Sequence, residues 1–514
     1  MKSLPLELLP VLGLLAVAAA PAQAQAQARS QVGVETEGDA ARTQPRTFVP
    51  RLSISETATS NVNLRAAKQS DLITSIAPGL YASSRGGRVQ GFVDYSLSGL
   101  LYAQDTRPNQ LLNALRANGS AEVLENTGFI DASASITQQA VNPLGVQSAD
   151  AQLGRDNQTE VRTLQLAPRL QGRLGAGVDW SARASHQNTS STSDLASNSS
   201  SSTAQLDIGN GSQPTRFGWS AQASRTQRSF SRGRTTDDDI LRGVLQYRPG
   251  PDFSAGVIGG YESTDIASVD KQGRATYGLQ LNWAPSARSQ LRSEVERRFF
   301  GNAYNVAFSY RWPRAALNFS DTRAMSNGAG QLTQINQGTN FSILDQQLAS
   351  TIKDAAEREN AVLEELKRRN LDPNAVVLVP FLSSGVTLSR AQQLSLAWLG
   401  ARDTLTLTVQ QSSTERLDAV TPDPLLNGAV RQRGYSLTLA HRLTPLSNLS
   451  LSLSQSRNRG RSSVSTELRT ATAQWSTALG PRSNFSLLGR RTLFTSSTQP
   501  YDESALIGTL GMTF

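Results

Sequence analysis

Apolar and polar residues alternate in steps of two through most of this chain, in one segment after another. One segment places its apolar residues on a single phase, with polar or small residues between them: Tyr304, Val306, Phe308, Tyr310 and Trp312. A strand turns successive side chains to opposite faces, so each such segment has one apolar and one polar face. Many segments of this kind, joined by turns, are typical of a transmembrane β-barrel. The pattern therefore predicts an all-β chain whose strands cross a membrane.

Gly- and Pro-containing turns separate these segments and alternate with longer polar connections, such as the serine-rich run from Thr189 to Thr203. Short turns on one side and long polar loops on the other are typical of outer-membrane barrels, whose short turns face the periplasm. We count about 22 antiparallel strands, within a range of roughly 18 to 24, and place the fourth of them at residues 117–124. A barrel this wide has a lumen that side chains do not fill.

The start of the chain is predicted to direct export. Lys2 is followed by a leucine-rich run and then by Ala22-Gln23-Ala24. This pattern predicts a secretory signal peptide over residues 1–24, although a short membrane anchor would also fit the run. Residues 25–47 are rich in Gln, Ala and Thr and are predicted to form a periplasmic leader, which leaves residues 48–514 for the barrel. Export of a barrel predicts the outer membrane of a Gram-negative cell.

One interval, residues 326–384, breaks the regular spacing of strands. Its centre has apolar residues at helical spacing, among them Leu344, Leu348 and Ile352. Asp372-Pro373 ends this stretch. The sequence therefore predicts one helical insertion, which plugs the lumen, caps the barrel outside or forms an ordered loop.

The composition leaves little room for catalysis. The chain has no cysteine and only 2 histidines, so thiolate metal sites and histidine-based acid–base chemistry are poorly supplied. His186 and His441 share the apolar phase of their strands, and hydrolase, metalloprotease and phosphate-loop motifs are absent from the sequence. We expect no enzyme activity, no cofactor and no metal. The net charge of +9 is spread along the chain, which with export argues against a nucleic-acid partner.

Charged residues on the polar phase of the strands are the candidates for lining the lumen. They are Arg183, Arg242, Arg248, Arg292, Arg298, Arg311, Arg490, Asp94, Asp131, Glu294 and Glu296. Rings of charge set the selectivity of a pore, and an excess of arginine favours anions or acidic glycans. The alternative is that these residues form Arg–carboxylate pairs that hold the wall of a wide barrel together.

The tryptophans and the last residue indicate a membrane interface. All six tryptophans lie near a predicted short turn and on the apolar phase: Trp180, Trp219, Trp283, Trp312, Trp398 and Trp475. Aromatic residues gather where lipid meets water, whereas the alternative, ordinary core tryptophans of a soluble β-protein, does not predict this clustering. Phe514 ends the final strand on the same phase, as expected for a signal read by the barrel-assembly machinery. The expected partners are therefore outer-membrane lipid and that machinery.

Several stretches resemble one family of outer-membrane barrels. They are residues 52–64 (LSISETATSNVNL), residues 75–80, residues 245–251 and, most distinctively, residues 381–407. Their sequence is similar to that of the uncharacterised, porin-like β-barrel family associated with the PEP-CTERM/exosortase system. The resemblance implies a role in the cell envelope, with exopolysaccharide or its export components as partners, and implies no reaction.

These features lead to three hypotheses. The first is an outer-membrane channel or export conduit linked to exopolysaccharide. The second is a structural scaffold barrel without an open pore. The third, a lipid-modifying barrel enzyme, has little support in the residues.

Overall fold

The computed structural model describes residues 46–514, apart from 151, 176, 195–196, 211–215, 327–382, 384, 419, 421–427 and 461–463. Its first eleven strands are β1 (Thr47–Thr59), β2 (Asp71–Gly86), β3 (Val89–Tyr102), β4 (Gln110–Leu124), β5 (Gly128–Ala140), β6 (Gln158–Leu174), β7 (Val178–Ser191), β8 (Ser199–Gly209), β9 (Phe217–Phe230), β10 (Thr236–Gly250) and β11 (Phe253–Thr264). The remaining strands are β12 (Gln272–Ser286), β13 (Ser289–Arg298), β14 (Gly301–Arg311), β15 (Ala315–Ser326), β16 (Thr387–Leu399), β17 (Asp403–Arg416), β18 (Val430–Arg442), β19 (Ser447–Arg459), β20 (Ser465–Gly480), β21 (Ser483–Ser496) and β22 (Tyr501–Thr513). A short 3-10 helix, η1 (Arg155–Asn157), precedes β6.

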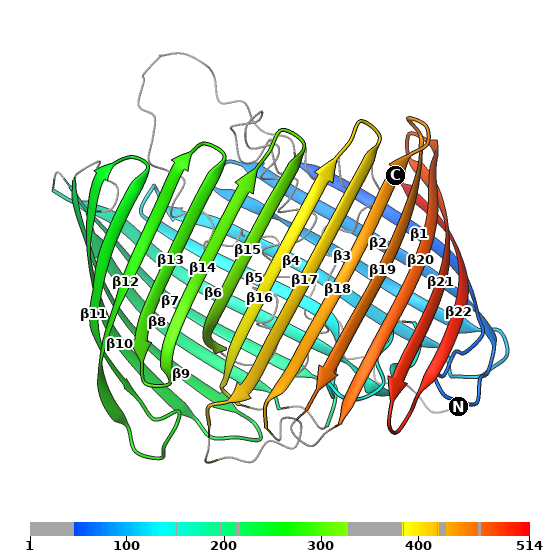
Figure 1. Cartoon of the computed structure of the whole chain (residues 1–514), viewed down its shortest axis with the longest axis horizontal. Helices are drawn as coiled ribbons and strands as arrows, with labels where there is room; N and C mark the ends of the chain where they lie inside the picture. Colours follow the sequence, from blue (N-terminus) through cyan, green and yellow to red (C-terminus); the bar gives the residue numbers. More distant parts are fainter. Residues whose placement is uncertain are drawn as a thin grey trace.

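The 22 strands form one closed antiparallel barrel (Figure 1). Each strand pairs with its neighbours in the sequence, and β1 closes the sheet against β22 in a register that runs from Arg51↔Thr513 to Thr59↔Ala505. Closure leaves no strand edge with unpaired backbone groups, which is the condition for a sheet to cross a membrane. The predicted all-β fold and the count of 22 strands are confirmed. Among the described residues, no helix is long and apolar enough to span a membrane.

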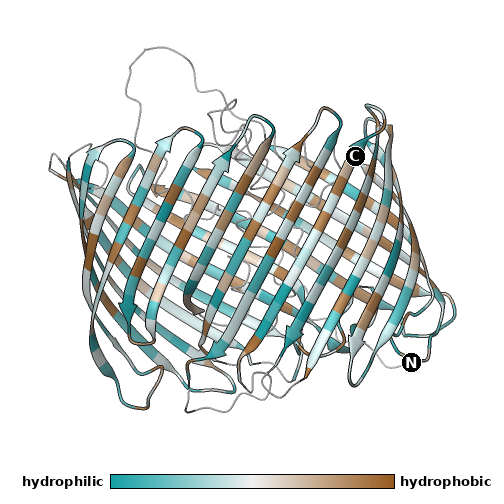
Figure 2. Cartoon of the chain, in the orientation of Figure 1, coloured by the Kyte–Doolittle hydropathy of each residue, from teal (hydrophilic) through white to brown (hydrophobic). Residues whose placement is uncertain are grey.

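Hydrophobic and hydrophilic residues alternate along the front strands of the barrel (Figure 2). On β17 and β18, Leu405, Leu407, Leu437 and Leu439 are exposed, whereas Thr406 between them is buried. The wall therefore turns its leucines outward and its threonines inward. A closed barrel with this alternation is an outer-membrane β-barrel.

Short turns and long loops lie at opposite ends of the barrel. The C-terminus lies at the short-turn end, uppermost in Figure 1. The first strand begins at the same end, because Arg51 pairs with Thr513 and Thr47 pairs with Ser83 beside the β2–β3 turn. Short turns face the periplasm in barrels of this class, so the opposite end is extracellular.

Two predictions about strand limits are wrong. Periodicity placed the start of the fourth strand near residue 117, but β4 begins at Gln110, because Leu111 faces outward while Leu112 packs against an apolar cluster inside the barrel. The run from Thr189 to Thr203 was expected to be a loop, yet β7 continues to Ser191 and β8 begins at Ser199. Hydroxyl pairs across strands, such as Thr203 with Thr226 at 3.1 Å, stabilise these polar strand ends.

Some predictions fall on residues that the structure does not describe. The signal peptide (1–24) and the leader (25–47) are covered only at Arg46 and Thr47, and Thr47 is already part of β1. The helix expected within residues 326–384 also lies outside the described residues.

Candidate functional site on the inner wall of the barrel

The charged residues expected to line the lumen stand on the strand phase opposite to the exposed apolar side chains. On β13, Arg292, Glu294, Glu296 and Arg298 alternate with outward residues such as Val295, which is exposed. By the same alternation and by register, Arg183, Arg242, Arg248, Arg311, Arg490, Asp94 and Asp131 occupy the inner phase of their strands. The inner wall is therefore polar and rich in arginine.

An ion-pair network links β10, β11 and β13 across the inner wall. Arg242 contacts Glu294 (Nη2 to Oε1, 2.5 Å) and Glu296 (Nε to Oε2, 3.0 Å). Arg298 pairs with Glu262, whose side chain is fully buried. These partners are separated by 36 to 54 positions in the sequence, and the register and tilt of the strands bring them together. Buried charges of this kind require partners, so the network stabilises this sector of the wall.

A second charged cluster spans β5, β6 and β7. Asp131 lies 3.6 Å from the Arg169 Nε atom and 3.7 Å from the Arg183 Nη2 atom. Arg169 and Arg183 are direct cross-strand partners, and the Arg169 guanidinium also lies 4.5 Å above the ring of Phe129. One carboxylate therefore serves two arginines, which leaves this sector positively charged. The remaining predicted carboxylate, that of Asp94, pairs with Arg51 on β1.

The periplasmic half of the inner wall holds arginines that contact neutral groups. Arg248 donates to Gln246 Oε1 at 2.8 Å. Arg292 faces the side-chain amide of Gln290. With this amide turned so that its oxygen points to the guanidinium group, the oxygen accepts from Arg292 Nη2 at 3.0 Å. Within the described part of the chain, neither Arg248 nor Arg292 has an ion pair. Their positive charge is therefore not cancelled by a neighbouring carboxylate and is available to a solute.

A loop folds into the extracellular mouth of the barrel and was not anticipated from the sequence. We call residues 141–157, which connect β5 to β6, the inward loop. Asp150 of this loop accepts from Arg490 Nη1 on β21 at 2.8 Å, and the carbonyl of Pro143 accepts from Asn458 Nδ2 on β19 at 2.9 Å. The loop thus reaches strands on the far side of the β1–β22 seam and narrows the mouth.

The inward loop rests on an apolar cluster inside the wall. The cluster consists of buried residues from β2, β3, β21 and β22, from the β1–β2 loop and from the inward loop: Val62, Leu64, Ile73, Leu100, Tyr102, Leu153, Phe494 and Tyr501. Tyr501 Oη donates to the Gln147 carbonyl at 2.5 Å and Tyr102 Oη donates to the Gln152 carbonyl at 3.2 Å. Adjacent apolar residues that break the alternation, such as Leu100-Leu101, were the available sequence signal for this cluster.

The tryptophans and both histidines stand on the outer phase. Trp219, Trp283, Trp312, Trp398 and Trp475 are exposed near the short-turn end, and Trp180 is half-exposed on β7 near the same end. His186 bonds to Ser202 at 2.9 Å and His441 to Asp403 at 2.6 Å. Phe514 is exposed beyond the end of β22. Neither histidine contributes to the inner wall.

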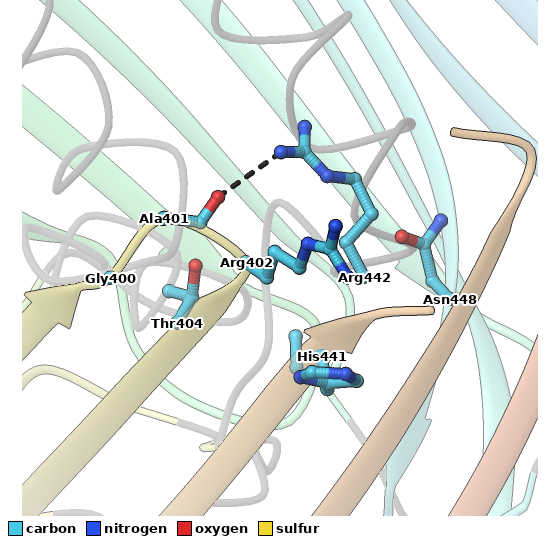
Figure 3. Close-up of a pocket in the computed structure, with 8 residues that line it drawn as sticks. Gly400, Ala401, Arg402, Thr404, His441, Arg442 and Asn448 are labelled. Carbon is cyan, nitrogen blue, oxygen red and sulfur yellow. Dashed lines mark hydrogen bonds between the residues drawn. The ribbon is translucent and has the colours of Figure 1, made fainter. Parts of the chain in front are cut away.

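A hollow at the periplasmic end of β16–β19 is too small for a solute. It has a volume of about 20 Å³ beside the turn at Gly400 and is lined in part by Arg442, which donates to the Ala401 carbonyl at 3.1 Å (Figure 3). A space of this size holds about one water molecule. In the described residues, no group of three or more His, Cys, Asp or Glu side chains could hold a metal ion. The continuous polar inner wall is therefore the candidate site.

These features define the class of protein: an outer-membrane β-barrel with a charged inner wall and a narrowed extracellular mouth. No protein-family model and no curated protein matches the chain. Among solved structures, the FrpB iron transporter from Neisseria meningitidis (F5-1 variant) is 10% identical, with a TM-score of 0.48 over 91% of this chain and 82% of that one. OccK2 (OpdF) of Pseudomonas aeruginosa, solved with glucuronate, is 11% identical, with a TM-score of 0.35 over 91% and 98%. OprD of Pseudomonas aeruginosa is 9% identical, with a TM-score of 0.33 over 91% and 95%.

Proposed function

We propose that this barrel is a channel or export conduit that carries anionic solutes across the outer membrane. The observation that supports this proposal most directly concerns Arg248 and Arg292. Among the described residues, no carboxylate neutralises the charge of either arginine. The Asp131 cluster adds a second sector with more arginine than carboxylate. Positive charge on the wall of a pore raises the local concentration of anions and repels cations.

The proposed solutes include acidic polysaccharide. The arginine guanidinium group binds a carboxylate through two parallel hydrogen bonds, and successive sugar acids would meet arginines on successive strands. The link to exopolysaccharide, to its export components and to the PEP-CTERM/exosortase system rests on the sequence resemblance of residues 381–407 and the other stretches described above. The candidate lumen-lining residues are, on this proposal, the selectivity-determining groups.

A scaffold barrel without an open pore is the second candidate function. Two observations favour it. The ion pairs of Arg242 and Arg298 stabilise the wall itself, and the inward loop occupies part of the extracellular mouth. In that case, the arginines would only stabilise the wall, and no ion current would pass through the barrel.

Planar-bilayer recording distinguishes the two functions. We expect the wild-type barrel to form pores whose reversal potential in a KCl gradient indicates preference for chloride. The double variant Arg248→Gln/Arg292→Gln should lose most of that preference and keep a similar conductance. The control is Arg297→Gln, because Arg297 lies on the outer phase of β13 beside Arg298. Cation selectivity, or an unchanged reversal potential in the double variant, would contradict the anion pathway.

The scaffold function makes a different prediction in the same assay. Protein that is folded but gives no pores, both as the full chain and after removal of residues 340–372, would exclude the channel.

The tryptophans are proposed to form the membrane-interface girdle under either function. Phe514 is likewise proposed to be the signal for the barrel-assembly machinery.

A further inference from the structure

Four arginines face one another on the outer surface of β18 and β19, near the extracellular end. Arg431 is the direct cross-strand partner of Arg459, and Arg433 is the partner of Arg457. We call these four residues the arginine ladder. All four are exposed, and they alternate with inward residues such as Gln432 and Asn458, which are buried. Like charges that stand directly opposite each other destabilise a sheet, so an anion bound between these arginines would relieve their repulsion.

The protein supplies little of that negative charge itself. Arg457 lies 3.8 Å from Glu467, but Glu467 makes its closer contact, 2.5 Å, with Arg469. Across the described residues, Arg431, Arg433 and Arg459 make no hydrogen bond or ion pair with a side chain.

The positive surface continues onto the next two strands. Arg469 on β20 and Arg491 on β21 also point outward, and Arg491 pairs with Asp502 at 2.6 Å, which Lys68 shares at 2.8 Å. The outward carboxylates of β17 to β22 near this end are Glu415, Glu467 and Asp502, against the six arginines and Lys68. The extracellular ends of β18–β21 are accordingly strongly hydrophilic (Figure 2).

An apolar groove lies beside this positive surface on the membrane-facing side of the wall. It is open to the outside, with a volume of about 370 Å³ across β17 to β21. Its apolar lining includes Leu407, Tyr435, Leu437, Leu453 and Leu493, beside the polar residues Ser436, Ser454, Gln455 and Thr470. Arg469 and Arg491 line the same groove. The groove exists because Ala471, a small residue, stands in register between Leu453 and Arg491. Positively charged arginine side chains and the apolar groove therefore meet at one place on the outer wall.

We propose that this surface binds a phosphate-bearing lipid of the outer leaflet. The phosphate group would lie against the arginine ladder, where guanidinium groups offer paired donors. An acyl chain of the same lipid would lie in the groove. The ladder is at the extracellular end of the strands, where headgroups are found, and the groove extends from it toward the membrane interior. A free anion would satisfy the ladder alone and would leave the groove empty.

The test uses the full-length barrel purified in a non-ionic detergent, with lipid binding measured by native mass spectrometry. The probes are diphosphorylated lipid A and the same lipid with its phosphates removed. We expect the quadruple variant Arg431→Gln/Arg433→Gln/Arg457→Gln/Arg459→Gln to bind the phosphorylated lipid about tenfold or more weakly, because several charge-assisted hydrogen bonds are lost. The matched control is Arg297→Gln/Arg323→Gln, two outward arginines on β13 and β15 that bond to Asn302.

Two further measurements keep the proposal open to refutation. Ala471→Trp should fill the groove and weaken binding of the acylated lipid while leaving the binding of inorganic phosphate unchanged. The quadruple Arg→Lys variant, which keeps the charge, should recover part of the affinity, and heat-modifiable migration on gels verifies that each variant is folded. Equal binding of the dephosphorylated lipid, unchanged binding by the quadruple Gln variant, or no effect of Ala471→Trp would overturn the proposal.

Discussion

Arg490 is the residue whose replacement should disturb this barrel most. Its side chain is 5% exposed and lies between Glu503, which is 1% exposed, and Asp150 of the inward loop. Arg490 donates to both oxygens of Glu503, from Nη2 to Oε1 at 3.1 Å and from Nε to Oε2 at 3.3 Å, and Thr59 Oγ1 on β1 donates to the same carboxylate at 3.0 Å. The contacts of Arg490, Glu503 and Thr59 thus join β21, β22 and β1 at the seam that closes the barrel.

Arg490→Gln would leave Glu503 as a buried charge without a cation. Breaking a buried ion pair by removing one partner costs about 3–5 kcal/mol. We expect the free energy of unfolding, measured in detergent micelles from tryptophan fluorescence in guanidinium chloride, to fall by about this amount. Asp150→Asn removes only the contact to the inward loop and should cost about 1–3 kcal/mol, while loosening the loop at this point and raising single-channel conductance.

The double variant Arg490→Met/Glu503→Leu is the control for this reasoning. It removes both charges and keeps side chains of similar size, so the free energy of unfolding should return close to that of the wild type. Two results would refute the argument. One is an Arg490→Gln variant as stable as the wild type. The other is a double variant as unstable as the single one, since the loss would then come from packing and not from an isolated charge.

Three further predictions concern the wall and its assembly. Leu407→Arg places a charge against lipid at a cost of about 2–4 kcal/mol near the midplane and should block folding, as judged by heat-modifiable migration on gels. Thr438→Arg, on the inner phase, should fold. Equal folding of both variants would show that the outward phase is misassigned. Glu262→Gln should lower thermal stability more than Glu294→Gln, because the Glu262 side chain is 0% exposed and that of Glu294 is 46% exposed; a larger effect at Glu294 would contradict the buried network. Deletion of Phe514 should slow insertion in cells and increase periplasmic aggregate, and normal outer-membrane yield of this variant would rule out its role as the assembly signal.

The sequence alone determined the architecture of the wall. Lipid on one side and water on the other impose a period of two on every strand, so the strand number and the outward phase are local properties that can be read from the chain. The same reasoning placed Trp398 outside and Arg298 inside. Where the inner environment is itself apolar, the period of two fails, and this is why the start of β4 at Gln110-Leu111-Leu112 was missed.

Tertiary structure decided which side chains meet. The partners of Arg298 and Arg490 lie 13 to 340 residues away in the sequence, and only the register and tilt of the strands bring them together. The inward loop leaves no periodic pattern, because its position depends on contacts with strands across the seam. The arginine ladder depends on the pairing of Arg431 with Arg459 and of Arg433 with Arg457. Alternation fixes the face of each residue, but a neighbour on the next strand is fixed only when the barrel closes.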